Sequence, residues 1–148
     1  MFIGPLNFCH FRQFDNYTCA VSSVYMVLLH LNKNPNYNDI YKKTKCLKNE
    51  GSLDTDVFDY FLSLGLKINV RNPLRKKDIV EALSKNKVIY VSLKTKPYPK
   101  EKDYHACVIY GIEGKSVYLA DPNEPYAVVM EWQELKRHSP SGMIISEY

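Results

Sequence analysis

Three residues of the kinds needed for thiol catalysis occur where secondary structure is expected to begin or end: Cys19, His105 and Asp121. A thiol nucleophile needs a base that takes its proton, a group that orients the base, and donors that stabilise the oxyanion. Histidine and aspartate suit the first two functions. Together with the amide of Gln13, six residues before Cys19, this combination points to nucleophilic catalysis by a cysteine.

Cys19 is predicted to lie in the first turn of a helix. Asp15, Asn16 and Thr18 precede it, and each of these side chains can cap a helix N-terminus. Unpaired N–H groups and the helix dipole favour a thiolate at that end. The alternative at this position is a buried cysteine that only fills space. The helix itself is predicted from one apolar face with helical spacing, made by Ala20, Val24, Val27, Leu28 and Leu31.

His105 is the histidine best placed to act as a base. It opens the apolar segment 105–111 after a proline-containing loop, at the start of the first strand of a predicted hairpin. The second strand, 116–120, ends at Asp121, and in a hairpin this end returns toward the start of the first strand. The Asp121 carboxylate can then fix the tautomer of the imidazole. A histidine at the rim of the core and a simple Asp-Pro turn are the alternatives.

The wider sequence predicts an α+β fold, with residues 1–148 forming a single domain. Helical patterns come first and strand patterns with turn signals come last, without the βαβ alternation of a parallel sheet. No glycine-rich phosphate loop, internal repeat or linker is present. The expected elements are an extended segment at 1–12, helices from 19 to between 32 and 35, from 37 to 45, from 52 or 55 to 64, from 73 to 85 and from 132 to 137, and strands at 66–70, 88–93, 104–110, 116–120, 126–130 and 143–146.

Composition argues against several functional classes. A content of 45% hydrophobic and 24% charged residues describes a folded chain. The net charge of +4 comes with scattered lysines and no recognisable nucleic-acid-binding module, so specific nucleic-acid binding is not expected.

Four cysteines without a CxxC spacing predict free thiols in a reducing compartment. No secretory signal is apparent, and apolar runs such as 24–29 are too short to span a bilayer. We expect a cytoplasmic protein, or one exported without a cleavable signal.

The motifs around the catalytic candidates resemble those of a known family. Gln13 and Cys19 have the spacing Gln-x5-Cys at the opening of a helix, and Ser23, Met26 and Leu28 follow. The predicted hairpin carries His-x3-Ile-Tyr-Gly and then Val-Tyr-x-Ala-Asp-Pro. This order is similar to that of papain-like cysteine peptidases of the bacteriocin-processing, double-glycine leader peptidase type. The resemblance extends over most of the chain, and the cysteine and histidine-to-aspartate segments are its specific parts.

The resemblance implies a stand-alone cysteine peptidase with a papain-like fold, in which a helical half packs on an antiparallel sheet. Cys19 would be the nucleophile, His105 the general base and acid, and Asp121 the orienting residue. Gln13 would donate to the oxyanion beside the backbone N–H of Cys19. The implied partner is a peptide or protein substrate, and no cofactor or metal ion is required. Two features depart from the family: no membrane segment accompanies the peptidase, and the glycine that usually follows the cysteine is Ala20.

Three other functions stay open from the sequence. A metal site is one, formed by Cys9, His10, His105 and Cys107. The paired spacing typical of structural zinc sites is absent, which disfavours it. A papain-like module that binds a peptide without cutting it is the second, although the full set of candidate residues favours chemistry. The third is acyl transfer to an amine or thiol, as in the phytochelatin-synthase-like enzymes, which are similar in motif order.

Overall fold

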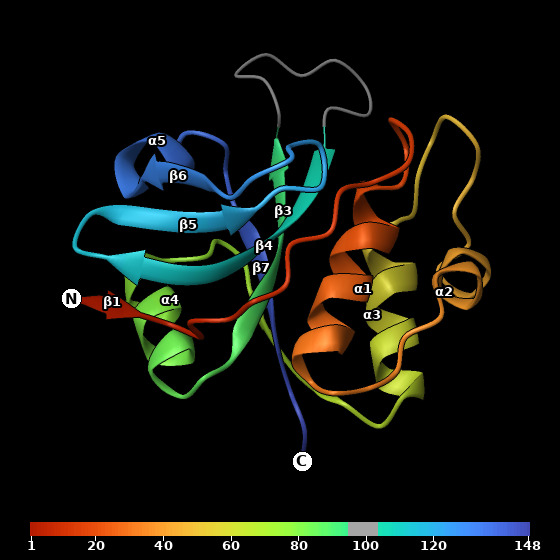
Figure 1. The fold of residues 1–148 in the computed structure, drawn as a ribbon, viewed down its shortest axis with the longest axis horizontal. Coiled ribbons are helices and arrows are strands. Elements are labelled where there is room, and N and C mark those ends of the chain that lie inside the picture. The colour runs from red at the N-terminus through yellow and green to blue at the C-terminus, as the bar shows by residue number, and fades with distance from the viewer. Residues whose placement is uncertain (95–103) are drawn as a thin grey trace.

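A computed structural model describes residues 1–94 and 104–148 of the chain (Figure 1). The predicted loop at 94–103 lies almost wholly outside the described residues. Helices are concentrated in the first half and strands in the second, as the sequence predicts. The elements are, in chain order, β1 (Phe2–Ile3), α1 (Cys19–His30), α2 (Tyr37–Lys43), α3 (Asp54–Ser63), β2 (Lys67–Arg71), α4 (Lys76–Ser84), β3 (Val88–Lys94), β4 (Tyr104–Glu113), β5 (Ser116–Ala120), β6 (Val128–Glu131), α5 (Trp132–Lys136) and β7 (Ser141–Ser146).

The strands form a sheet in which paired neighbours are antiparallel. The strand order is β2-β7-β3-β4-β5-β6, and β1 pairs with the far end of β4. In the central pair, Leu93 of β3 lies opposite His105 of β4. In the β4–β5 hairpin, Val108 lies opposite Ala120. This register returns the end of β5 toward the start of β4, which confirms the predicted hairpin.

Helices cover both faces of the sheet (Figure 1). Helices α1, α2 and α3 pack on one face, and α4 and α5 pack on the other. Strand β3 is buried on both sides, because successive side chains of a strand point to opposite faces. Val88 and Tyr90 enter the core beneath α1 to α3, and Ile89, Val91 and Leu93 enter the core beneath α4 and α5. The resemblance implies two layers, a helical half and a sheet, and α4 and α5 form a third layer on the other face of the sheet.

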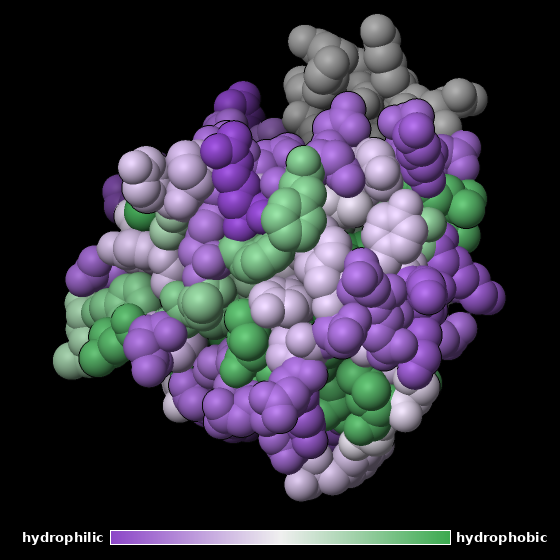
Figure 2. Space-filling view, turned by 45° about the vertical axis from the view of Figure 1, so that its right-hand side comes forward, coloured by the Kyte–Doolittle hydropathy of each residue, from purple (hydrophilic) through white to green (hydrophobic). Residues whose placement is uncertain are grey.

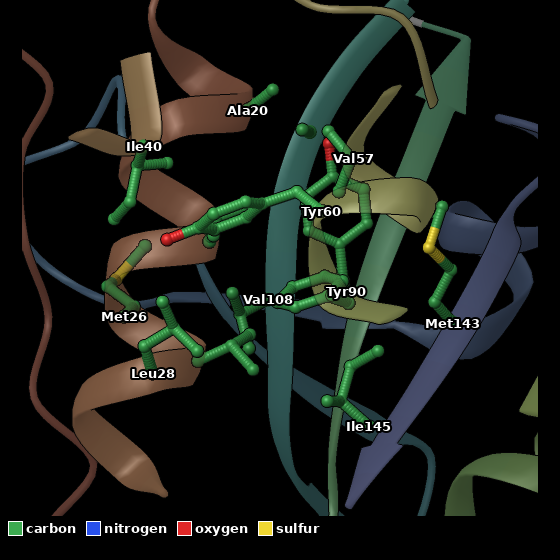
Figure 3. Packing of buried hydrophobic residues seen from close by; sticks show 14 of the residues in the cluster. Ala20, Met26, Leu28, Ile40, Val57, Tyr60, Tyr90, Val108, Met143 and Ile145 are labelled. Atoms are coloured by element: carbon green, nitrogen blue, oxygen red, sulfur yellow. The ribbon is translucent and has the colours of Figure 1, made fainter. Parts of the chain in front are cut away.

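Helix α1 is packed as its periodicity predicts. Four of the five expected apolar positions are buried, and Leu31 is half-buried against the same core. Figure 3 shows Leu28 of α1 lying toward Val108 of β4. Because the core holds the helix along its length, Cys19 at its first residue has a defined position beside the sheet.

Two predicted elements are longer than the observed ones: only Phe2–Ile3 of the segment 1–12 form a strand, and α1 ends at His30, before the predicted 32–35. The other boundaries differ from the predicted ones by at most three residues. Helix α4 begins three residues later than expected, and the N–H of Leu74 bonds there to the carbonyl of Pro140. The Asp78 side chain then accepts from the N–H of Arg75 at 2.9 Å, at the start of α4. Helix α3 is followed by Gly65 with a φ of 75°, the positive-φ stop that the sequence indicates.

The surface agrees with the scattered charge pattern of the sequence. Hydrophilic residues cover most of the face seen in Figure 2, and hydrophobic residues lie there in separate patches. The lysines of the described segments are exposed or half-exposed, as expected for solvated faces. Among the helices of residues 1–94 and 104–148, none combines the length and the apolar character that crossing a membrane requires.

Candidate active site

Cys19 is the first residue of α1, where the sequence places it. The bend before the helix is organised by the Asp15 carboxylate, which accepts from the Tyr17 N–H at 3.1 Å and the Thr18 hydroxyl at 2.8 Å. Thr18 is the N-cap residue, but its side chain makes no capping hydrogen bond. The side-chain cap that Thr18 could supply is not formed, because its φ of −103° and ψ of 24° are not the extended conformation of a capping residue. The first N–H groups of the helix stay available, and that of Ala20 donates to the Cys19 sulfur.

His105 and Asp121 are hydrogen-bonded to each other. Nε2 of His105 lies 2.5 Å from Oδ1 of Asp121, and the two side chains are only 13% and 23% exposed. Asp121 directly follows β5, so the hairpin register returns it to the start of β4. The same carboxylate oxygen accepts the N–H of Asn123 at 2.9 Å, which fixes its orientation.

The thiol of Cys19 is hydrogen-bonded to His105. Since Nε2 of the ring faces Asp121, Nδ1 is the nitrogen left for the thiol. The backbone N–H of Ala106, the residue after His105, also donates to the sulfur. The three residues therefore form one continuous chain of hydrogen bonds that joins α1 to the β4–β5 hairpin.

These contacts shift the pKa values of all three residues. Burial raises the pKa of the Cys19 thiol, but the hydrogen bond and positive charge of His105 and two backbone donors outweigh burial and lower it. Burial lowers the pKa of His105, and hydrogen bonds to Asp121 and Cys19 reverse this effect and raise it to about 10. Burial also raises the pKa of Asp121, which His105 brings below its usual value. Both shifts favour a thiolate paired with an imidazolium over the neutral pair.

We expect iodoacetamide to alkylate Cys19 faster at neutral pH than the other three cysteines. Cys9 is exposed, so accessibility alone would favour Cys9. Cys46 and Cys107 are buried, and burial raises the pKa of both thiols. The Cys19 rate should reach its plateau at a lower pH than an ordinary thiol and change again near pH 10, as His105 loses its proton. Timed labelling with peptide mapping measures these rates, and a Cys9 as reactive as Cys19 would contradict the thiolate assignment.

Gln13 lies beside Asp121 but does not line the pocket at Cys19. Its backbone N–H donates to the carbonyl of Pro122 at 2.9 Å. Its buried side-chain amide donates to the carbonyl of Asp15, and its Oε1 has no hydrogen-bond partner among the described residues. An amide nitrogen carries two hydrogens, so one donor is used by the bend and a second remains. The role of Gln13 at the oxyanion stays a prediction.

Cys19 and His105 line a pocket of about 330 Å³ bordered by residues 49–54. A second pocket of about 330 Å³ shares Asp54, Tyr90 and Ser92 with the first. The shared residues make the two pockets neighbours, and we call the two together the substrate groove. Its lining near Cys19 has both polar and apolar surface. Its far part includes apolar side chains from α3, β2 and β7, namely Phe58, Val70 and Met143.

Sequence reasoning missed the groove residues and the Ala106 donor. Asp54 begins α3, whereas Tyr90 and Ser92 belong to β3, and only the packing of the helix against the sheet brings them together. Ala106 contributes through its backbone N–H, for which the side chain gives no signal. In the sequence, Asp54 has the pattern of an acidic residue in the first turn of a helix, which gives no sign that it lines a pocket.

The other three histidines each contact a backbone carbonyl. The contacts are His10 to Glu124 at 2.5 Å, His30 to Asn86 at 3.0 Å and His138 to Lys94 at 2.7 Å. The alternative metal site is not assembled, because Cys107 is buried in the core beneath α4 and α5. Within residues 1–94 and 104–148, no group of three His, Cys, Asp or Glu side chains is arranged to hold a metal ion.

Solved structures with the same fold are peptidase domains. The peptidase domain of Streptococcus ComA, a bifunctional ABC transporter involved in quorum sensing, has a TM-score of 0.75 at 12% identity and covers 96% of this chain and 100% of that one. A double-glycine-motif protease from an AMS/PCAT transporter, crystallised with the leader peptide, has a TM-score of 0.76 at 18% identity and covers 97% and 95%. A C39-like peptidase from Bacillus anthracis has a TM-score of 0.75 at 14% identity and covers 99% and 98%. At these identities the likeness shows the fold, which is the predicted papain-like one.

A family model extends the agreement to the sequence. The model of the Peptidase_C39-like family matches residues 5–139, which include both the Cys19 helix and the His105 to Asp121 hairpin. A comparison with curated proteins gives no match. The family match covers most of the chain, so the chain belongs to the Peptidase_C39-like family and is a cysteine-type peptidase.

Proposed function

We propose that Cys19, His105 and Asp121 are the catalytic triad of this peptidase, and that it cleaves a peptide or isopeptide bond through a thioester intermediate. The continuous hydrogen-bonded chain from thiol to imidazole to carboxylate carries this proposal. The lowered pKa of the thiol and the raised pKa of the imidazole favour a thiolate and an imidazolium. These are the charge states in which a thiol attacks a carbonyl and a histidine then protonates the leaving group.

The geometry defines a role for each residue in acylation. The Cys19 thiolate attacks the substrate carbonyl carbon, a C–S bond forms, and an electron pair moves to the carbonyl oxygen. The backbone N–H of Cys19 and the side chain of Gln13 are the proposed donors to that oxyanion. When the intermediate collapses, the C–N bond breaks and the His105 imidazolium gives its proton to the leaving amine. Asp121 stays ionised and keeps the ring in its tautomer.

Deacylation uses the same residues in reverse. Water attacks the thioester carbonyl while neutral His105 accepts a proton from it. The C–S bond then breaks, which releases the carboxylic acid product and regenerates the Cys19 thiolate. The imidazolium formed in this step restores the starting ion pair.

A peptide bound along the substrate groove is the proposed substrate. A structural neighbour, the protease from an AMS/PCAT transporter, is crystallised with its leader peptide, which supports a peptide ligand for this fold. Ala20 lines the pocket beside Cys19, where its methyl group narrows the space that a glycine would leave. A narrow site suits small residues next to the scissile bond, such as a pair of glycines.

The proposal is tested with a defined peptide set and mass spectrometry. Peptides with an internal Gly-Gly, and matched peptides with Leu-Leu in its place, are incubated with the wild type and with Cys19→Ala. We expect the wild type to cleave the Gly-Gly peptides and Cys19→Ala to cleave none. Cys9→Ala, which removes an exposed thiol that does not line the substrate groove, should keep full activity. A parallel incubation with hydroxylamine tests the thioester intermediate, because hydroxylamine attacks its carbonyl and releases a hydroxamate product. Cleavage that persists in Cys19→Ala would contradict the triad.

A further inference from the structure

Asp121 lies in a turn, residues 121–124, that is closed by local hydrogen bonds. The N–H of Glu124 donates to the backbone carbonyl of Asp121 at 3.0 Å. The N–H of Asn123 donates to the Asp121 side chain at 2.9 Å. These bonds set the shape of the turn, but they do not by themselves set its position relative to the rest of the site.

The N-terminal segment holds this turn from outside at two places. The N–H of Gln13 donates to the carbonyl of Pro122 at 2.9 Å. Nε2 of His10 lies 2.5 Å from the carbonyl oxygen of Glu124. The second and the fourth residue of the turn are therefore both anchored to the segment that leads into Cys19.

His10 is committed to this contact. Its other ring nitrogen, Nδ1, is buried and has no hydrogen-bond partner among the described residues. Nε2 is therefore the nitrogen that donates to the Glu124 carbonyl. The pKa of Asp121 is set mainly by burial, which raises it, and by His105 and Asn123, which lower it. His10 adds a smaller lowering through its electrostatic interaction with the carboxylate.

We propose that His10 is a positioning residue of the active site, which holds the Glu124 carbonyl and thereby keeps the Asp121 turn against His105. The inference rests on the proposed triad and adds to it a residue that touches neither the substrate nor the reacting atoms. If residues 121–124 move away from His105, the Asp121 carboxylate no longer orients the imidazole toward the thiol of Cys19. A misplacement of about 1 Å can cost about 10²-fold in rate.

The test compares substitutions of two histidines that make the same kind of contact. His10→Ala should lower kcat about tenfold or more with KM unchanged. His10→Gln, whose amide N–H reaches a similar distance, should restore most of the rate. His30→Ala removes an equivalent bond to a backbone carbonyl away from the triad, so it should leave kcat unchanged.

The pH profile of Cys19 alkylation supplies a readout that a general loss of stability would not move. Asp121 and Cys19 are the groups whose bonds and charges raise the pKa of His105, and neither is substituted in His10→Ala. A displaced Asp121 supports the imidazolium less, so the alkaline change in the profile should shift to lower pH in this variant. His10→Gln should return it to the wild-type position.

A double substitution decides the matter. If His10 acts through Asp121, His10→Ala should cost little more in an Asp121→Ala background, whereas an additive loss would overturn the proposal. Wild-type kcat and an unshifted profile in His10→Ala would also overturn it. His10→Asn, too short to reach Glu124, makes the same comparison if the alanine variant does not fold. A wild-type Cys19 no more reactive than Cys9 would instead refute the triad, which is a separate result.

Discussion

Replacing His105 by alanine is expected to reduce kcat by a factor on the order of 10⁴ to 10⁶, the usual loss when the base of a triad is removed. The thiolate of Cys19 loses the positive charge and the hydrogen bond that lower its pKa, while burial continues to raise it. Two effects should therefore appear together: turnover of the cleavable peptide ceases, and the alkylation rate of Cys19 at neutral pH falls. Steady-state kinetics and timed labelling measure them on the same preparation.

Two histidines serve as controls for this substitution. His30 and His138 bond to the backbone carbonyls of Asn86 and Lys94, away from the thiol. Alanine at either position should leave both kcat and Cys19 labelling close to wild type. If His138→Ala were as damaging as His105→Ala, with the circular dichroism spectrum unchanged, the choice of base would be wrong.

Replacing Gln13 by alanine is expected to lower kcat by about 10²–10³, with a much smaller change in KM. The side-chain amide has one N–H engaged by Asp15, and the second is the proposed donor to the oxyanion. A donor of this kind acts mainly in the transition state, so substrate binding should be nearly preserved. Alkylation of Cys19 should also be preserved, because that reaction forms no oxyanion.

Gln13→Glu separates this role from packing. The variant keeps the size of the side chain but places a negative charge near the developing oxyanion, so it should be at least as damaging as Gln13→Ala. The Gln13 backbone bond to Pro122 is retained in both variants, which leaves the Asp121 turn anchored. Wild-type turnover in Gln13→Ala would show that other donors stabilise the oxyanion.

Local patterns were sufficient to predict most of the fold. The periodicity of 20–31 identified the buried face of α1. The hairpin rule brought Asp121 to His105. In each case the signal is carried by residues close in sequence, or by a two-strand register that a short turn fixes.

The parts that could not be predicted depend on packing between distant segments. The substrate groove needs the start of α3 to lie over β3, and no pattern within either element specifies this. The role inferred for His10 depends on a contact with Glu124 across most of the chain. The Thr18 cap is not formed because the backbone of Thr18 is not extended, a conformation that the sequence pattern does not specify.

The distance in sequence between Cys19 and its partners has a consequence for synthesis of the protein. Cys19 leaves the ribosome before His105 and Asp121, which follow it in the sequence by 86 and 102 residues. Until the β4–β5 hairpin docks on α1, the sulfur lacks the imidazole that lowers its pKa. A nascent or misfolded copy therefore carries a thiol of ordinary reactivity, and completion of the fold is itself the step that activates the nucleophile.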